Sequence, residues 1–169
     1  MPRSRLLSAV AGCVLAAGAL LATSAATQAE AEPAAPADVP KHALVGYLHA
    51  SFANGSGYTR MSDVPDEWDI IDLAFGEPTT ATSGEIQFEL CPSDECPNVE
   101  STEEFIAAIK DKQAAGKKVL LSIGGEKGQV QLTTEAARDA FVSSVSAIID
   151  KYGLDGLDVD FEGHSLYLD

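Results

Sequence analysis

Four short apolar runs, separated by segments whose apolar residues have helical spacing, place the strongest limit on how this chain can fold. The expected strands are residues 43–48, 70–75, 118–123 and 154–162. Continuous apolar strands that alternate with helices are typical of a parallel sheet whose outer face is covered. The pattern therefore predicts an α/β fold, either a doubly wound sheet or a β/α barrel.

Two helices between these strands have clear end signals. Residues 101–104 (STEE) form a capping box that opens the first helix, and Gly116 suits its C-terminal end. The second helix is expected to begin near Thr133 or Thr134, and Gly153 follows it as a stop. We also expect a short helical turn within residues 61–68 and a loop insertion over residues 77–100.

Residues 1–31 have the three-part pattern of a secretory signal peptide. Two arginines precede an apolar run over residues 6–22, and residues 29–31 (AEA) offer a small-residue cleavage site. The apolar run falls short of the roughly 20 residues that a spanning helix needs, so a membrane anchor is the weaker alternative. We therefore expect a secreted, extracellular protein, in which residues 32–41 form an Ala/Pro-rich leader.

The charge balance excludes some classes of partner. The chain has 11 basic and 26 acidic residues and a formal net charge of −15. A nucleic-acid binder needs a basic face that displaces counterions from phosphate, so this class is disfavoured. Attraction to an anionic membrane surface is disfavoured for the same reason. After signal cleavage we expect neither nucleic acid nor membrane as a partner.

Export also changes the interpretation of the cysteines. Once the signal peptide is removed, Cys91 and Cys96 are the pair that remains. Outside the cell this spacing predicts a disulfide that closes a small loop. A metal site is the alternative, but it would need two further ligands, and no His or further Cys lies near in the sequence.

The most informative stretch is residues 155–162 (DGLDVDFE), in which acidic and apolar residues alternate. The acidic residues are Asp158, Asp160 and Glu162, and the apolar residues between and before them are Leu157, Val159 and Phe161. On a strand the two sets lie on opposite faces, with neighbours on one face roughly 6.6 Å apart. We expect the apolar set to pack under helices and the acidic set to face inward.

Three carboxyls in a row on an inward face suggest acid–base chemistry. Burying all three in ionised form is costly, so coupled titration keeps at least one protonated near neutral pH. A protonated carboxyl at the C-terminal end of a barrel strand is what a general acid requires. Glu162 is the last of the three and has the longest reach toward a cleft.

Two alternatives to catalysis stay open at this point. A solvated acidic face is one, although a parallel strand between helices normally has no solvated face. A calcium loop is the other, because oxygen ligands from Asp158 to Asp169 fall at EF-hand positions. Apolar residues stand between those ligands, and the preceding segment is strand-like rather than helical. The residues alone therefore favour catalysis over a metal site or a structural role.

Two motifs in the right order resemble a known family. Residues 155–162 match the D-G-x-D-x-D-x-E signature of family 18 glycoside hydrolases, the chitinases, and residues 122–125 (SIGG) match their S-x-G-G motif. Residues 46–47 (GY) and 74–75 (AF) also fit. The resemblance runs from about residue 44 to the end of the chain and points toward bacterial chitinases of the chitinase D type.

The resemblance implies a TIM barrel that acts on chitin or other N-acetylglucosamine-containing glycans, with no metal and no cofactor. Glu162 would protonate the glycosidic oxygen. Asp160 would orient the acetamido group of the substrate for attack on C1, and Asp158 would share a proton with Asp160. The implied mechanism is substrate-assisted and retaining, an exception to the scheme with two catalytic carboxylates.

The resemblance also implies a set of substrate-binding positions around these carboxyls. Tyr47 and Ser122 would form hydrogen bonds near Asp158. Phe75 would line the floor of the sugar site. Gly124 and Gly125 complete this set, although a glycine pair by itself also fits a plain turn.

The chain departs from the family in length. A closed β/α barrel has eight strands and typically about 250 residues. Residues 42–169 are therefore expected to be the N-terminal half of the catalytic barrel, with about four β/α units, inactive alone and active in the intact parent. The alternatives are an endo-β-N-acetylglucosaminidase acting on N-glycans and a non-catalytic chitin-binding lectin. Such lectins usually lack the acid, and Glu162 is present.

Overall fold

The computed structural model describes residues 39–166. The predicted signal peptide and most of the predicted leader lie outside the described residues, as do residues 167–169. Within the described range, neither helix has the length and apolar character needed to cross a membrane.

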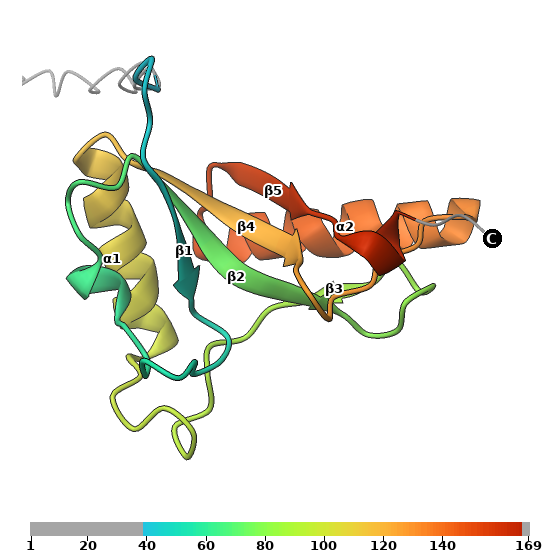
Figure 1. The fold of residues 1–169 in the computed structure, drawn as a ribbon, viewed down its shortest axis with the longest axis horizontal. Helices are drawn as coiled ribbons and strands as arrows, with labels where there is room; N and C mark the ends of the chain where they lie inside the picture. Colours follow the sequence, from blue (N-terminus) through green and yellow to red (C-terminus); the bar gives the residue numbers. More distant parts are fainter. Residues whose placement is uncertain (1–38, 167–169) are drawn as a thin grey trace, which may run out of the picture. The chain divides into compact units, whose positions relative to one another are not determined.

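Four parallel strands form the main sheet, in the order β1-β2-β4-β5. They are β1 (Val45–His49), β2 (Ile70–Pro78), β4 (Lys118–Gly124) and β5 (Gly156–Asp160). A short strand, β3 (Ile86–Gln87), pairs antiparallel with the end of β2. Figure 1 shows the four parallel strands side by side, with β1 and β5 at the two edges. The predicted parallel α/β sheet is thus present.

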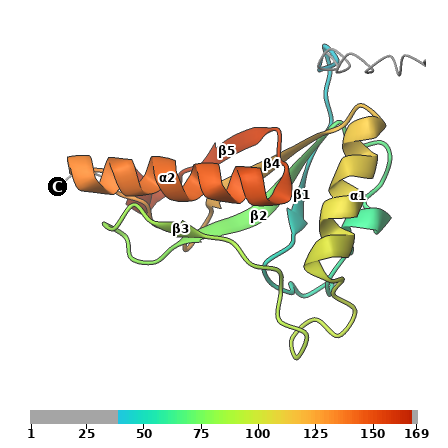
Figure 2. The ribbon, with the colours of Figure 1, turned by 180° about the vertical axis from the view of Figure 1, so that it is seen from behind.

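Both α-helices cover one face of this sheet, as the view from behind shows (Figure 2). They are α1 (Thr102–Ala114) and α2 (Glu135–Tyr152), and two 3-10 turns are η1 (Met61–Asp63) and η2 (Gly163–Ser165). The predicted capping box is present, because the Ser101 side chain accepts from the Glu104 N–H and the Glu104 carboxylate accepts from the Ser101 N–H. Thr134 caps α2, and Gly153 ends it with a φ of 69°.

The hydrophobic core lies between the helices and the outer face of the sheet. Fully buried side chains come from alternate positions of the two central strands and from the facing sides of both helices. They include Ile71, Leu73, Val119, Leu121 and Ile123 of the strands, and Phe105, Ile109 and Tyr152 of the helices. Each such aliphatic side chain contributes about 1.5–3 kcal/mol of transfer free energy. Because these positions point outward to the helices, the residues between them point inward.

The inner face of the sheet is strongly curved. The Tyr47 hydroxyl of β1 donates to Asp158 Oδ2 of β5 at 3.1 Å, although β2 and β4 lie between the two strands. In a flat sheet, three strand intervals would separate them by about 14 Å, which is more than the two side chains can span. The described strands therefore form a concave arc, as in part of a barrel wall.

Some expected boundaries differ from the structure. β2 continues to Pro78, so the expected loop over residues 77–100 begins with strand and also contains β3. The short helical turn expected within residues 61–68, by contrast, is present as the 3-10 turn η1 in the crossover from β1 to β2. The alternating pattern predicts that Val159 packs under helices, but its side chain is 53% exposed, because β5 is an edge strand and no described helix covers this position.

A disulfide links Cys91 and Cys96, with Cα atoms 5.9 Å apart. Both cysteines are buried and form a small cluster with Tyr58, separate from the main core. In residues 39–166, no three His, Cys, Asp or Glu side chains come together in a group that could hold a metal ion.

Candidate active site

The acidic residues of the sequence motif lie at the carboxyl end of β5. Asp158 pairs in register with Ser122 of β4, and Asp160 pairs with Gly124. β5 ends at Asp160, two residues before the expected end, and Glu162 follows in extended conformation with its side chain exposed. In β/α folds this end of the strands is where ligands and catalytic groups are found.

Asp158 is held by two hydroxyl groups from two other strands. Its Oδ2 accepts from the Ser122 hydroxyl at 2.7 Å and from the Tyr47 hydroxyl at 3.1 Å. Burial, the hydrogen bond to Asp158 and the neighbouring carboxylates raise the pKa of Tyr47 to about 12. Tyr47 therefore stays protonated and remains a donor at any physiological pH. Ser122 is fully buried, so its hydroxyl acts on Asp158 rather than facing open space.

The glycine pair after β4 lets two parts of the site approach each other. Gly124 has a φ of 108° and Gly125 a φ of 67°, a region that residues with a Cβ rarely adopt. The Gly125 N–H donates to the Asp160 carbonyl at 2.8 Å, which ties β4 to the end of β5. A Cβ on Gly125 would lie 2.9 Å from the Phe75 ring. The glycines therefore fix the backbone at Asp160 and leave room for the aromatic ring.

The segment after Glu162 is anchored to the loop between β4 and α2. The Ser165 N–H donates to the Glu162 carbonyl at 2.7 Å, which closes the turn η2. His164 Nε2 donates to the Glu126 carbonyl at 2.6 Å, and the Gln129 side-chain amide donates to the His164 carbonyl at 3.1 Å. These bonds hold the backbone of Glu162 in place, while its carboxyl stays exposed.

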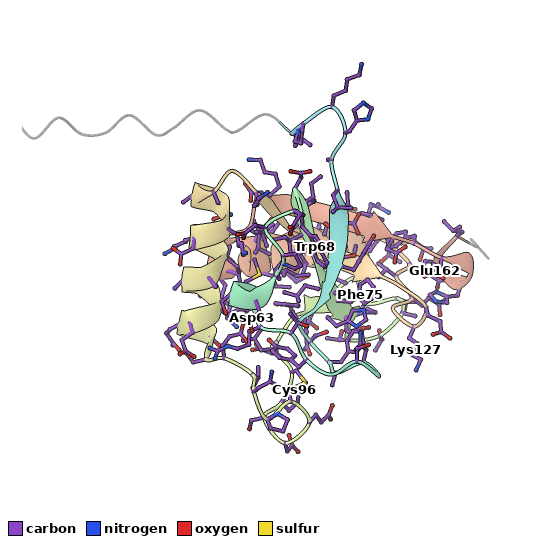
Figure 3. All side chains as sticks on the ribbon, turned by 60° about the vertical axis from the view of Figure 1, so that its left-hand side comes forward. Asp63, Trp68, Phe75, Cys96, Lys127 and Glu162 are labelled. Atoms are coloured by element: carbon purple, nitrogen blue, oxygen red, sulfur yellow. A yellow bond between two sulfur atoms is a disulfide. The ribbon has the colours of Figure 1, made fainter. Side chains whose placement is uncertain are left out.

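A pocket of about 520 Å³ opens beside this group of residues. The rings of Phe52 and Phe75 are nearly parallel in it, 11° apart in plane with centroids 6.4 Å apart. Glu77 and Lys127 add polar groups, and burial raises the pKa of Glu77. Figure 3 shows Phe75, Lys127 and Glu162 in the region where the strands end, away from Cys96 in its own loop. An apolar pocket with a few polar groups is typical of a small-molecule site.

One further carboxyl lies on the inner face and was not predicted. Asp72 of β2 pairs in register with Tyr47 and is only 2% exposed. Burial, and then the negative charges of Asp158 and Asp160, raise the pKa of Asp72 to about 6. In the sequence Asp72 stands alone inside the apolar run of residues 70–75, so no alternating acidic pattern marks it as part of a site.

Most of the residues predicted from the sequence thus lie at one end of the sheet. Tyr47, Ser122 and Asp158 form one hydrogen-bonded group, as the family resemblance implies. Phe75 and Gly124 line the adjacent pocket.

The family model of the glycosyl hydrolases family 18 matches residues 24–167. The chain belongs to this family. It is 76% identical over 143 residues to Exochitinase 1 of Streptomyces olivaceoviridis, a match that covers 85% of this chain and 24% of the relative. It is 40% identical over 126 residues to Chitinase D of Niallia circulans, covering 74% of this chain and 22% of the relative.

Among solved structures, a family GH18 chitinase from Chromobacterium violaceum matches with a TM-score of 0.66 and 42% identity. The match covers 75% of this chain and 32% of that one. The chain therefore spans less than a third of the length of these family 18 relatives. Membership of the family implies the TIM-barrel fold, of which the described residues hold four parallel strands.

Proposed function

We propose that the full-length protein carrying this sequence is a secreted chitinase, which cleaves β-1,4-linked N-acetylglucosamine polymers with retention of configuration. The observation that carries this proposal is the group at the end of β5, in which Asp158, with two hydroxyl donors, precedes Asp160 and the exposed Glu162. The names of the family 18 relatives, Exochitinase 1 and Chitinase D, support chitin as the substrate.

Glu162 is the proposed general acid. The carboxyl of Glu162 is exposed, whereas its backbone is held in place by the turn that follows. The side chain can therefore reach a ligand from a fixed backbone position. In the first step it gives its proton to the glycosidic oxygen as the bond from that oxygen to C1 breaks. In the second step its carboxylate takes a proton from the water that adds to C1 as the bond from the acetamido oxygen to C1 breaks, which restores the acid and the acetamido group.

Asp160 and Asp158 are proposed to act on the acetamido group of the substrate. Asp160 accepts a hydrogen bond from the acetamido N–H and so directs the carbonyl oxygen to C1. The substrate then supplies the nucleophile, and the positive charge that develops on the acetamido group is stabilised by the carboxylate pair. The two hydroxyls on Asp158 Oδ2 hold its orientation, so that its other oxygen can share a proton with Asp160.

The adjacent pocket is the proposed position for a sugar ring. Its volume of about 520 Å³ falls within the range of small-molecule sites, and the parallel Phe52 and Phe75 rings offer flat apolar surfaces. Gly124 belongs both to this pocket and to the β4–β5 register at Asp160, which supports a sugar bound next to the carboxyls.

Secretion is supported by two independent features. The pattern of residues 1–31 is that of a signal peptide. The disulfide between Cys91 and Cys96 fits an oxidising environment outside the cytosol.

The test is the Glu162→Gln variant of the full-length protein, assayed on chito-oligosaccharides. The amide keeps the shape of the side chain but has no proton to transfer, so we expect kcat to fall by about 100-fold or more. Glu103→Gln on the exposed side of α1 is the matched control and should keep the wild-type rate. Retention of more than about a tenth of the activity would contradict the role of Glu162. Release of N-glycans in place of chito-oligosaccharide cleavage would favour an endo-β-N-acetylglucosaminidase.

A further inference from the structure

The carboxyl of Asp72 takes no part in the mechanism above, although it lies on the same inner face of the sheet. It is 2% exposed, and its Oδ1 has no hydrogen-bond partner among the described residues. A buried polar atom without a partner costs free energy, and a buried charge costs more. A hydrophobic residue at this position would avoid that cost, so the carboxyl calls for a functional explanation.

The polar groups near Asp72 on the neighbouring strands are one hydroxyl and two carboxylates. Its register partners are Tyr47 of β1 and Leu120 of β4, and the Tyr47 hydroxyl donates to Asp158. From β5 the carboxylates Asp158 and Asp160 both act on Asp72 by charge repulsion. Asp72 therefore lies beside a hydrogen-bonded network whose donors are already engaged with another acid.

No cation in the described part of the chain is among the groups that act on the Asp72 carboxyl. The lysine at the start of β4, Lys118, pairs with Asp155 at 3.2 Å. The groups that shift the pKa of Asp72 include no cation, and the pKa rises to about 6 through burial and then through Asp158 and Asp160. Repulsion between charges is mutual, so an ionised Asp72 also repels the charges of Asp158 and Asp160.

We propose that Asp72 is a positioning residue for the reaction, a fourth inner-face carboxyl whose buried charge keeps one proton on the Asp158–Asp160 pair. This inference rests on the proposed function, because the shared proton matters only if the pair acts on the acetamido group. Once Asp72 is ionised, its negative charge disfavours a second charge on the Asp158–Asp160 pair. The pair therefore keeps its proton to higher pH. Replacing the carboxyl by an amide removes that charge and lets the proton leave at lower pH.

The first test is the pH dependence of kcat/KM for Asp72→Asn in the full-length protein, on a soluble chito-oligosaccharide. We expect the alkaline limb to move to lower pH by about half a unit or more, with kcat at pH 8 reduced several-fold and KM within about twofold. The matched control is Asp139→Asn, at an exposed position of α2, whose profile should overlay the wild type. An unshifted profile in an active Asp72→Asn variant would overturn the inference and leave the proposed function standing. An inactive wild-type protein would contradict the proposed function.

The second test uses the wild-type protein and needs neither activity nor a folded variant. Aspartate carboxyl carbons are labelled with ¹³C and titrated by NMR, with Asp139 as an exposed reference. The Asp72 carbon should titrate well above the ordinary range, and the Asp158 and Asp160 carbons should show an additional inflection at the same pH. Independent single inflections for the three residues, or an Asp72 titration in the ordinary range, would overturn the inference.

Discussion

At the scale of single residues, one oxygen of Asp158 connects three strands. Tyr47 of β1 and Ser122 of β4 both donate to Oδ2, so the orientation of this carboxyl depends on side chains that are 111 and 36 residues away in the sequence. Asp72 lies beside them without a donor for its Oδ1 among the described residues. The same inner face thus holds one carboxyl whose Oδ2 accepts two hydrogen bonds and one whose Oδ1 has no partner among the described residues.

We expect Asp72 to make stability fall as the pH rises. Its pKa is raised in the folded protein to about 6, so ionisation is disfavoured relative to the unfolded chain. Its stabilising contribution is complete below the ordinary aspartate pKa and is lost as the pH rises through about 6. Relative to Asp72→Asn, the wild-type free energy of unfolding should fall by on the order of 2–3 kcal/mol between pH 4 and pH 7.

Urea unfolding of the full-length protein and the variant at both pH values measures this difference. Asp139→Asn on the surface of α2 serves as the control, for which the difference from wild type should stay nearly constant. A difference between wild type and Asp72→Asn that does not change with pH would contradict the expected shift.

The sequence could predict the site residues that form a local pattern. Asp158, Asp160 and Glu162 are marked by their alternation with apolar residues, which predicts that all three share one face of a strand, whereas β5 ends at Asp160. Asp72 could not be found in this way, because a single aspartate within an apolar run gives no periodic signal. Its role depends on which strands become neighbours, and that is decided only by tertiary packing.

At the scale of elements, the end of β4 requires glycine for steric reasons. Gly124 has a φ of 108°, and a Cβ there would collide with the carbonyl oxygen of Asp160. We expect Gly124→Ala to lower stability by about 2 kcal/mol or more and to reduce kcat by more than about tenfold, since the end of β5 must move away. Thermal unfolding and the chito-oligosaccharide assay measure the two effects.

Gly156 at the start of β5 provides the matched control for this change. A Cβ there would lie 3.6 Å from a Leu120 methyl group, an ordinary van der Waals contact. Gly156→Ala should therefore change stability by less than about 1 kcal/mol. If both substitutions had the same small effect, close backbone contact at Gly124 would not be the reason for its glycine.

The elements with local signals were predictable, and those without were not. The capping box at Ser101 and the glycine stop at Gly153 predict helix ends because these signals act within a few residues. The short strand β3 has no such signal, since two residues become a strand only by pairing with the end of β2. The exposure of Val159 likewise depends on what covers β5, which its own pattern does not show.

At the scale of the whole molecule, the described sheet has two edges. β1 and β5 are each hydrogen-bonded to one strand only within residues 39–166. Val45 on β1 is 46% exposed, and Val159 on β5 is 53% exposed. Unpaired edges with apolar side chains favour pairing with other strands, which a closed barrel supplies from within one chain.

We therefore expect the 169-residue chain, expressed by itself without residues 1–31, to associate and to be inactive on chito-oligosaccharides. Its free edges can pair with those of a second copy, and the inner face would hold a sugar from one side only. The net charge is −15 for the full sequence and −16 without residues 1–31, which carry two arginines and one glutamate; this charge opposes association, but physiological salt limits its range to about 8 Å. Size-exclusion chromatography with light scattering, run beside the activity assay, tests both parts of this prediction. A monomer that unfolds cooperatively and turns over substrate would show that four strands are sufficient, and that the edges of β1 and β5 are stable without partners.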